Sequence, residues 1–165
     1  MKEWMKRLSW VPAVIMMVII FLFSAKTADQ SNQQSSFVAE IALDAVETVA
    51  GVEYRQELEA DAVRMDGLVF LIRKLAHATE YAVLAVCVGL HVLASRKERG
   101  LLYFLAVVGV CALYVCSDEV HQLFVSGRSG QISDVCVDTA GAAVGALFLY
   151  AAAGRRLSRI FGTQE

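Results

Sequence analysis

The chain has 165 residues, of which 57% are hydrophobic, and its formal net charge is −2. Soluble domains usually contain at most about half apolar residues, so this composition indicates a membrane protein. A net charge close to zero gives no support for nucleic-acid binding. The length fits one domain that occupies the whole chain, residues 1–165.

Four segments are apolar enough to cross a bilayer. The hydrocarbon core is about 30 Å thick and a helix rises about 1.5 Å per residue, so a span needs about 20 residues. The third segment reaches this length only if its helix continues through Gln122. The sequence therefore predicts an all-α, polytopic membrane helix bundle with about four transmembrane helices. We expect the spans at about residues 8–25, 75–94, 101–122 and 132–153.

Basic residues in three places indicate the orientation of this bundle. Because basic loop residues favour the cytoplasmic side, and all three groups fall on the same side of a four-span protein, we expect both termini to be cytoplasmic. The other side receives an acidic segment at about residues 26–72. The basic groups are Lys2, Lys6 and Arg7, then Arg96, Lys97 and Arg99, and finally Arg155, Arg156 and Arg159.

The segment 26–72 is expected to hold short amphipathic helices on the outer face. Ser31 to Ser36 is polar and suits a loop followed by an N-cap. Apolar residues then recur at helical spacing from Phe37 to Val49, and a second such stretch runs from about Tyr54 to Ile72. These helices could cover a site as a lid, or they could simply shield a small bundle.

Ionisable and polar residues gather at the outer ends of three predicted spans. Charge near hydrocarbon costs about 2.5–3.5 kcal/mol per residue at a helix centre, so such residues usually pair or line a functional cavity. We expect them to form one outer-facing polar pocket. They are Arg73, Lys74, His77 and Glu80 on the second span; Asp118, Glu119, His121, Gln122 and Arg128 at the end of the third; and Asp134 and Asp138 on the fourth.

The fourth span places two acids and two glycines on one stripe. Asp138 is about 6 Å deeper than Asp134 along the helix, among alanine, valine and leucine. It therefore needs a partner, for which Arg128, His77 and Lys74 are the candidates. Gly141 and Gly145 form a GxxxG pattern, which is typical of close helix packing.

Three ordered motifs give the chain a family resemblance. They are Arg73-Lys74-x-x-His77-x-x-Glu80-Tyr81, then Ser117-Asp118-Glu119-x-His121-Gln122-x-Phe124 with Gly127-Arg128, and Asp134-x-x-x-Asp138-Thr139-x-Gly141-x-x-x-Gly145. Together with Phe23-Ser24-Ala25 at the end of the first span, they resemble the VanZ-like membrane proteins over most of the chain. Ser126 departs from the pattern, because many relatives carry proline there. The expected turn is looser, but Arg128 keeps its place.

The resemblance implies a small multi-helix protein of the bacterial plasma membrane. The family's namesake is associated with resistance to the lipoglycopeptide teicoplanin. The resemblance carries over no reaction and no cofactor, and we assign no metal. The partners it suggests are membrane lipids, a lipid-linked cell-wall precursor or a lipoglycopeptide.

Three interpretations of the polar residues compete. They could form a purely structural network of paired charges. They could bind a lipid head group, with Arg73, Lys74 and Arg128 contacting phosphate. They could also belong to an enzyme that acts on a lipid-linked phosphate or cell-wall precursor. In that case His77 or Glu80 would serve as general base and Arg128 would stabilise an anionic transition state. A metal variant of the enzyme would use His77, Glu80, Glu119 and His121.

Overall fold

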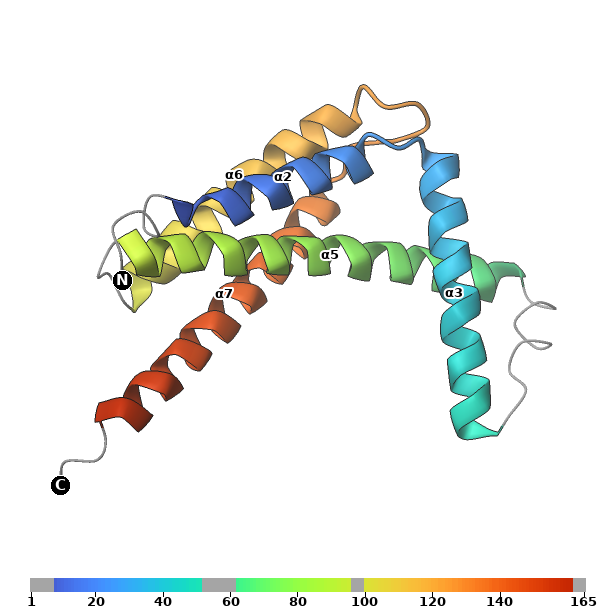
Figure 1. Cartoon of the computed structure of the whole chain (residues 1–165). Helices are drawn as coiled ribbons and strands as arrows, with labels where there is room; N and C mark the ends of the chain where they lie inside the picture. The colour runs from blue at the N-terminus through green and yellow to red at the C-terminus, as the bar shows by residue number, and fades with distance from the viewer. Residues whose placement is uncertain (1–7, 52–61, 96–99, 162–165) are drawn as a thin grey trace.

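The computed structural model describes residues 8–51, 62–95 and 100–161, and these ranges form five helices and no strand (Figure 1). The predicted all-α class is therefore confirmed. The basic residues 2–7 and 96–99, and the predicted helix start near Tyr54, lie outside the described residues. The helices are α2 (Val11–Ser24), α3 (Ala28–Ala50), α5 (Ala62–Ser95), α6 (Leu101–Gln122) and α7 (Ile132–Phe161).

Three of these helices are long and apolar enough to cross a membrane. The crossing segments are Val63–Ala94 of α5, Leu101–Gln122 of α6 and Ile132–Ala153 of α7. The bounds in α6 and α7 coincide with those expected from the sequence. With 14 residues, α2 is too short alone. It reaches span length only together with α3, from which it is separated by a bend of 105°.

Helix α5 is the centre of the bundle, because it contacts each of the other four helices. Helices α2 and α6 lie along one side of it, α7 crosses it at an angle, and α3 crosses it near its N-terminal end (Figure 1). The largest fully buried side chains include Tyr81 and Leu84 of α5 and Tyr103 and Val107 of α6. Helix α2 is held to α6 by a 2.6 Å hydrogen bond from the Tyr114 hydroxyl to the Met17 carbonyl.

Glycines bring α5 and α7 into backbone contact. A Cβ atom at Gly141 would overlap the Ala78 carbonyl, and one at Gly145 would overlap the Ala82 carbonyl. The neighbouring Ala142 and Ala146 are fully buried. The GxxxG pattern therefore acts in packing, as the sequence indicated. This crossing sets the position of α7 along α5, and it thereby brings Asp134 at the start of α7 level with Lys74 of α5.

Helix α3 begins earlier than the sequence indicated. Thr27 caps it through a capping box, in which the Gln30 amide donates to the Thr27 hydroxyl and the Thr27 amide donates to the Gln30 side chain. The predicted loop at Ser31–Ser36 was wrong, since these residues are helical. Ser31, Ser35, Ala39 and Leu43 are buried at a spacing of four, and α3 packs mainly on α5. Small side chains let the two helices approach closely.

Instead of two short outer helices, the described residues contain the 23-residue α3 and an N-terminal extension of α5. The segment before the second span continues into it without a break, because no proline or helix-stopping turn separates Ala62 from Ala94. At about 1.5 Å per residue, Lys74 lies about 30 Å along the helix from Ala94. This distance matches the hydrocarbon thickness, so the earlier turns of α5 extend past the apolar region.

Replacing Thr27 by alanine should expose the first turn of α3. Loss of an N-cap costs about 1 kcal/mol, so hydrogen exchange at the Gln30 amide should become about fivefold faster. Thr48→Ala is the matched control, because the Thr48 hydroxyl donates to the Asp44 carbonyl within the same helix and caps no amide. Equal exchange at Gln30 in both variants would contradict the role of the capping box.

The ends of the helices divide into two groups. The start of α2, the end of α5, the start of α6 and the end of α7 lie at one end of the bundle (Figure 1). The α2–α3 corner and the α6–α7 connection lie at the other. The basic residues that indicated the orientation adjoin the first group in the sequence. Which group faces the cytoplasm stays a prediction.

Candidate functional site

An ion pair between α5 and α7 marks the outer edge of the site. The Lys74 ammonium group contacts the Asp134 carboxylate, and both side chains are partly buried. Asp134 also accepts a 3.1 Å hydrogen bond from the Ser133 hydroxyl. The contact forms because the close α5–α7 crossing brings the two helices to the same level. Lys74 is thereby matched to a carboxylate of its own protein.

The last turns of α6 contribute three buried polar side chains. Asp118, Glu119 and Gln122 are each 4–7% exposed. The Gln122 amide donates to Asp118 Oδ2 at 3.2 Å. Glu119 Oε2 accepts from the backbone amide of Gln131 at 2.8 Å, immediately before α7. Glu119 therefore joins the end of α6 to the start of α7.

His77 and Glu80 lie on one face of α5, as their spacing of three predicted. His77 Nδ1 is 3.8 Å from Glu80 Oε2, which is too long for a hydrogen bond. Neither atom has a hydrogen-bond partner in the described part of the chain, although both are buried. The two side chains are thus close in space, but the facing atoms form no hydrogen bond with each other.

Arg128 holds the α6–α7 connection against the α2–α3 corner. Its Nε donates to the Lys26 carbonyl at 3.2 Å, and the Ala28 amide donates to the Ser126 carbonyl at 3.3 Å. Gly127 adopts a positive φ of 73° between them and lies against Ala28. We call these two contacting segments, residues 25–28 and 126–128, the outer clasp.

The second guanidinium of the site belongs to Arg73. It donates to the side-chain oxygen of Asn32 on α3 at 2.8 Å and lies over the Phe70 ring. Within the residues described, neither Arg73 nor Arg128 makes an ion pair with a carboxylate; each donates to a neutral oxygen instead.

Arg128 keeps its charge in this position. Partial burial, together with the nearby charge of Arg73, lowers the pKa of Arg128 from its ordinary value of 12.5. An arginine nevertheless remains protonated in proteins. The site therefore contains two guanidinium groups that repel one another, and each donates one hydrogen bond to the described residues.

Electrostatic interactions show that the residues from separate helices converge. Asp118 interacts with His77, Glu80 and Tyr81 of α5, with Asp138 of α7 and with Arg128. Asp138 also interacts with Asp134, Glu119 and Lys74. Asp118 is therefore the common neighbour of the polar residues.

Two predicted site residues are placed differently from the rest. The His121 ring packs against Phe21 of α2 at a centroid distance of 4.5 Å, so this histidine faces the first helix. Asp138 is 4% exposed and forms no ion pair among the residues that the structure describes. Of its expected partners, Lys74 binds Asp134 instead, because Asp134 lies at the same level as the ammonium group.

Sequence reasoning missed residues that the fold adds to the site. Lys26, from the α2–α3 corner, accepts from Arg128 through its carbonyl, and its ammonium group interacts with Glu80. Asn32 was assigned to a loop, whereas it lies on α3 and contacts Arg73. Tyr81 belonged to the first motif but received no role. No local signal distinguishes these residues, since only the return of α3 across α5 brings Asn32 to Arg73.

Several polar atoms in the cluster are buried without a hydrogen-bond partner in the described ranges. A buried polar atom left unpaired costs about 1–3 kcal/mol, and native proteins contain few of them. Such atoms usually mark a bound molecule or water. They are Ser24 Oγ, His77 Nδ1, Glu80 Oε2, Tyr81 OH, Asp118 Oδ1 and His121 Nε2.

The proposed metal ligands do not meet. Among residues 8–51, 62–95 and 100–161, no three His, Cys, Asp or Glu side chains are arranged to hold a metal ion. The metal variant of the enzyme interpretation required His77, Glu80, Glu119 and His121 in one place. His121 faces Phe21, which separates it from the others.

A hollow of about 560 Å³ lies along the polar face of α3. Asn32 lines it and connects it to Arg73. Asp29 and Glu40 give it an acidic lining, so it suits no anion. The remaining lining residues are Gln33, Ser36 and Phe37.

A family model described as VanZ/LLP1 matches residues 9–153, which include every helix segment that contributes to the site. No match was found among curated proteins or among solved structures.

Proposed function

The chain belongs to the VanZ/LLP1 family of membrane proteins, and from this premise we propose that its outer polar site binds the phosphate of an envelope lipid head group. The observation that carries the proposal is that Arg73 and Arg128 form no ion pair with a carboxylate of the described residues. A guanidinium binds phosphate in bidentate fashion, and each charge-assisted hydrogen bond contributes about 1.5–3 kcal/mol.

The sources of charge in the site differ from those expected. Lys74 is occupied by Asp134, so it no longer counts as a phosphate ligand. Arg73 and Arg128 keep free donors, and Lys26 adds an ammonium group at the corner. The anion-binding part of the site is therefore made by Arg73, Arg128 and Lys26, next to the outer clasp.

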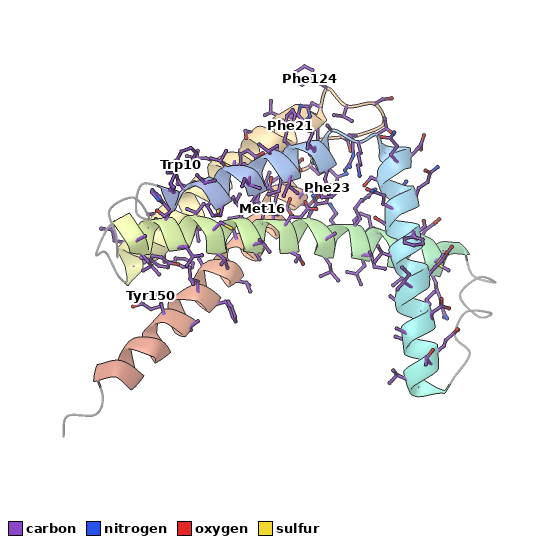
Figure 2. The ribbon with its side chains drawn as sticks, in the orientation of Figure 1. Trp10, Met16, Phe21, Phe23, Phe124 and Tyr150 are labelled. Carbon is purple, nitrogen blue, oxygen red and sulfur yellow. The ribbon has the colours of Figure 1, made fainter. Side chains whose placement is uncertain are left out.

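The surroundings of the site suit a ligand with acyl chains. Large apolar side chains are exposed on α2, α6 and α7 beside the polar cluster, among them Phe21 and Val137. Phe124 is 84% exposed and points away from the bundle at the α6–α7 end (Figure 2). A lipid could keep its chains along these helices while its phosphate enters the cluster.

The same chemistry extends to larger ligands. A lipid-linked cell-wall precursor carries phosphate next to its lipid, and a lipoglycopeptide carries an acyl chain next to polar groups. The family resemblance connects the second with teicoplanin resistance. We therefore propose that the protein, in the bacterial plasma membrane, acts on resistance by binding one of these lipid-bearing molecules rather than by catalysing a reaction.

The phosphate requirement can be tested with two lipids that differ only in phosphate. Protein in detergent would be offered phosphatidic acid or diacylglycerol with the same acyl chains, and bound lipid would be counted by native mass spectrometry. We expect a preference for phosphatidic acid of at least about tenfold. The double variant Arg73→Gln/Arg128→Gln should lose this preference, because the loss of two charge-assisted contacts is worth more than about 1.4 kcal/mol.

Matched variants separate binding from folding. A glutamine amide nitrogen stands at the same bond count as an arginine Nε, so Arg128→Gln can keep the donor to the Lys26 carbonyl in the outer clasp. Arg64→Gln removes an exposed charge about 14 Å away on α5 and should leave the lipid preference unchanged. Equal retention of phosphatidic acid by the double variant and the wild type would refute the proposal.

A further inference from the structure

The inner part of the site has acceptors that no described residue satisfies. Asp118 is 4% exposed, and its Oδ1 has no hydrogen-bond partner in the described chain. The buried Tyr81 hydroxyl lies beside Asp118, with which it has a hydrogen-bonding as well as an electrostatic interaction, and its oxygen accepts no hydrogen bond from the described residues. Glu80 Oε2 completes the set. Glu80 and Tyr81 belong to α5, and Asp118 belongs to α6.

Among the described residues, Arg128 and Lys26 act electrostatically on Asp118 and Glu80, but neither cation forms an ion pair with them. Lys74 pairs with Asp134 at the outer edge, and Arg128 donates to the outer clasp. Between the described residues, neither Asp118 nor Asp138 makes an ion pair. Removing a partner from a buried charge costs several kcal/mol, so a cation from outside would stabilise acids that the fold leaves without an ion pair.

We propose that Glu80, Tyr81 and Asp118 bind the primary ammonium group of the same ligand whose phosphate contacts Arg73 and Arg128. The inference rests on the proposed function and specifies the ligand class, a phosphate ester that carries a primary amine. An ammonium group has three N–H donors. The site offers three unsatisfied acceptors for them: Asp118 Oδ1, Glu80 Oε2 and the Tyr81 hydroxyl oxygen.

The two parts of the site adjoin one another. Arg128 interacts electrostatically with Asp118, and Lys26 interacts with Glu80. Along the helices, Glu80 is about 9 Å deeper than Lys74, and Asp118 is about 6 Å deeper than Gln122. A zwitterionic head group could therefore place its phosphate at the outer arginines and its amine one to two helical turns deeper.

Two other kinds of cation fit this site less well than a primary ammonium. The described residues hold no arrangement of three ligands for a metal ion. A quaternary ammonium has no N–H to donate, so it would leave Asp118 Oδ1 and Glu80 Oε2 unpaired. An unpaired buried acceptor costs about 1–3 kcal/mol, which makes discrimination between primary and quaternary amines the diagnostic property of this site.

The test compares head groups on the same acyl chains. Protein in nanodiscs or detergent would be presented with equal amounts of phosphatidic acid, phosphatidylethanolamine, phosphatidylcholine and phosphatidylglycerol, and bound lipid would be counted by native mass spectrometry. We expect phosphatidylethanolamine to be retained at least about tenfold more than phosphatidylcholine. Asp118→Asn should lower phosphatidylethanolamine retention to the level of phosphatidylcholine while leaving phosphatidic acid unchanged.

Two further variants keep the test decisive. Tyr81→Phe removes one acceptor without changing charge, and it should reduce the ethanolamine preference by a smaller factor than Asp118→Asn. Asp66→Asn, on an exposed position of α5, is the matched control and should change nothing. If Asp118→Asn does not fold, the inference is tested by two measurements: the ratio of phosphatidylethanolamine to phosphatidylcholine retained by the wild type, and the change of this ratio in Tyr81→Phe.

The outcomes separate this inference from the proposed function. Equal retention of phosphatidylethanolamine and phosphatidylcholine, with both still dependent on Arg73 and Arg128, overturns the ammonium site and leaves phosphate binding intact. A preference for phosphatidylglycerol over phosphatidylethanolamine also overturns it, since hydroxyl groups would then be the ligand. If lipid binding does not depend on the two arginines, the proposed function itself fails.

Discussion

Replacing Gly141 or Gly145 by alanine should destabilise the bundle more than any other single methyl group added to it. Each new Cβ would overlap a carbonyl of α5, that of Ala78 or that of Ala82. Backbone cannot rotate away as a side chain can, so the helices must separate. Overpacking of a core costs about 1–3 kcal/mol, occasionally more, and we expect the upper end of this range.

Gly109 provides the control for this prediction. It lies in α6, and a Cβ there would meet nothing within 4 Å. Because alanine is the better helix former by about 0.5–1 kcal/mol, Gly109→Ala should be neutral or stabilising. The midpoint of unfolding by sodium dodecyl sulfate in mixed micelles gives the comparison. Similar midpoints for Gly141→Ala and Gly109→Ala would show that α5 and α7 are not in backbone contact.

Neutralising Lys74 should destabilise the protein more than neutralising its partner Asp134. Lys74→Gln leaves Asp134 beside Asp138 and Glu119, and Lys74 is the cation that acts on both of these acids. Asp134→Asn instead leaves Lys74 able to pair with Asp138 or Glu119. Breaking a buried pair costs about 3–5 kcal/mol. Since the two side chains are 15% and 23% exposed, about 2–4 kcal/mol is expected for Lys74→Gln.

The two single variants are expected to lose unequal amounts of stability. Asp134→Asn should cost less than half as much as Lys74→Gln in the same detergent unfolding assay. The double variant should be more stable than Lys74→Gln alone, because it removes one of the stranded carboxylates. Equal losses for the two single variants would mean that the pair is isolated from Asp138 and Glu119.

The membrane-crossing helices could be predicted because hydrophobic length is a local property. Leu101–Gln122 and Ile132–Ala153 have the bounds that the apolar runs indicated. The serine-rich stretch could not be predicted in the same way. Ser31 and Ser35 disfavour a helix by propensity, but they are the small side chains that let α3 pack on α5. Tertiary packing decided their conformation.

For the site, the sequence predicted the residues better than it predicted their pairing. The polar residues at three span ends were expected to converge, and Asp118 interacts electrostatically with Glu80 of α5 and Asp138 of α7. The partner of Lys74 depends on the height at which α7 crosses α5, which the glycines determine. The contacts of Arg128 and Arg73 depend on the α2–α3 corner, because it places the Lys26 carbonyl and Asn32 beside them. Neither is encoded within a single segment.

The outer clasp joins chain segments that are synthesised far apart. The first amide of α3 is satisfied by the Ser126 carbonyl, and the corner before it by Arg128. During biosynthesis, the α2–α3 corner therefore completes these contacts only after about three quarters of the polypeptide has been made. Premature termination before residue 126 would leave α2 and α3 with their contacts to α5 but would expose the first amide of α3 and the corner before it.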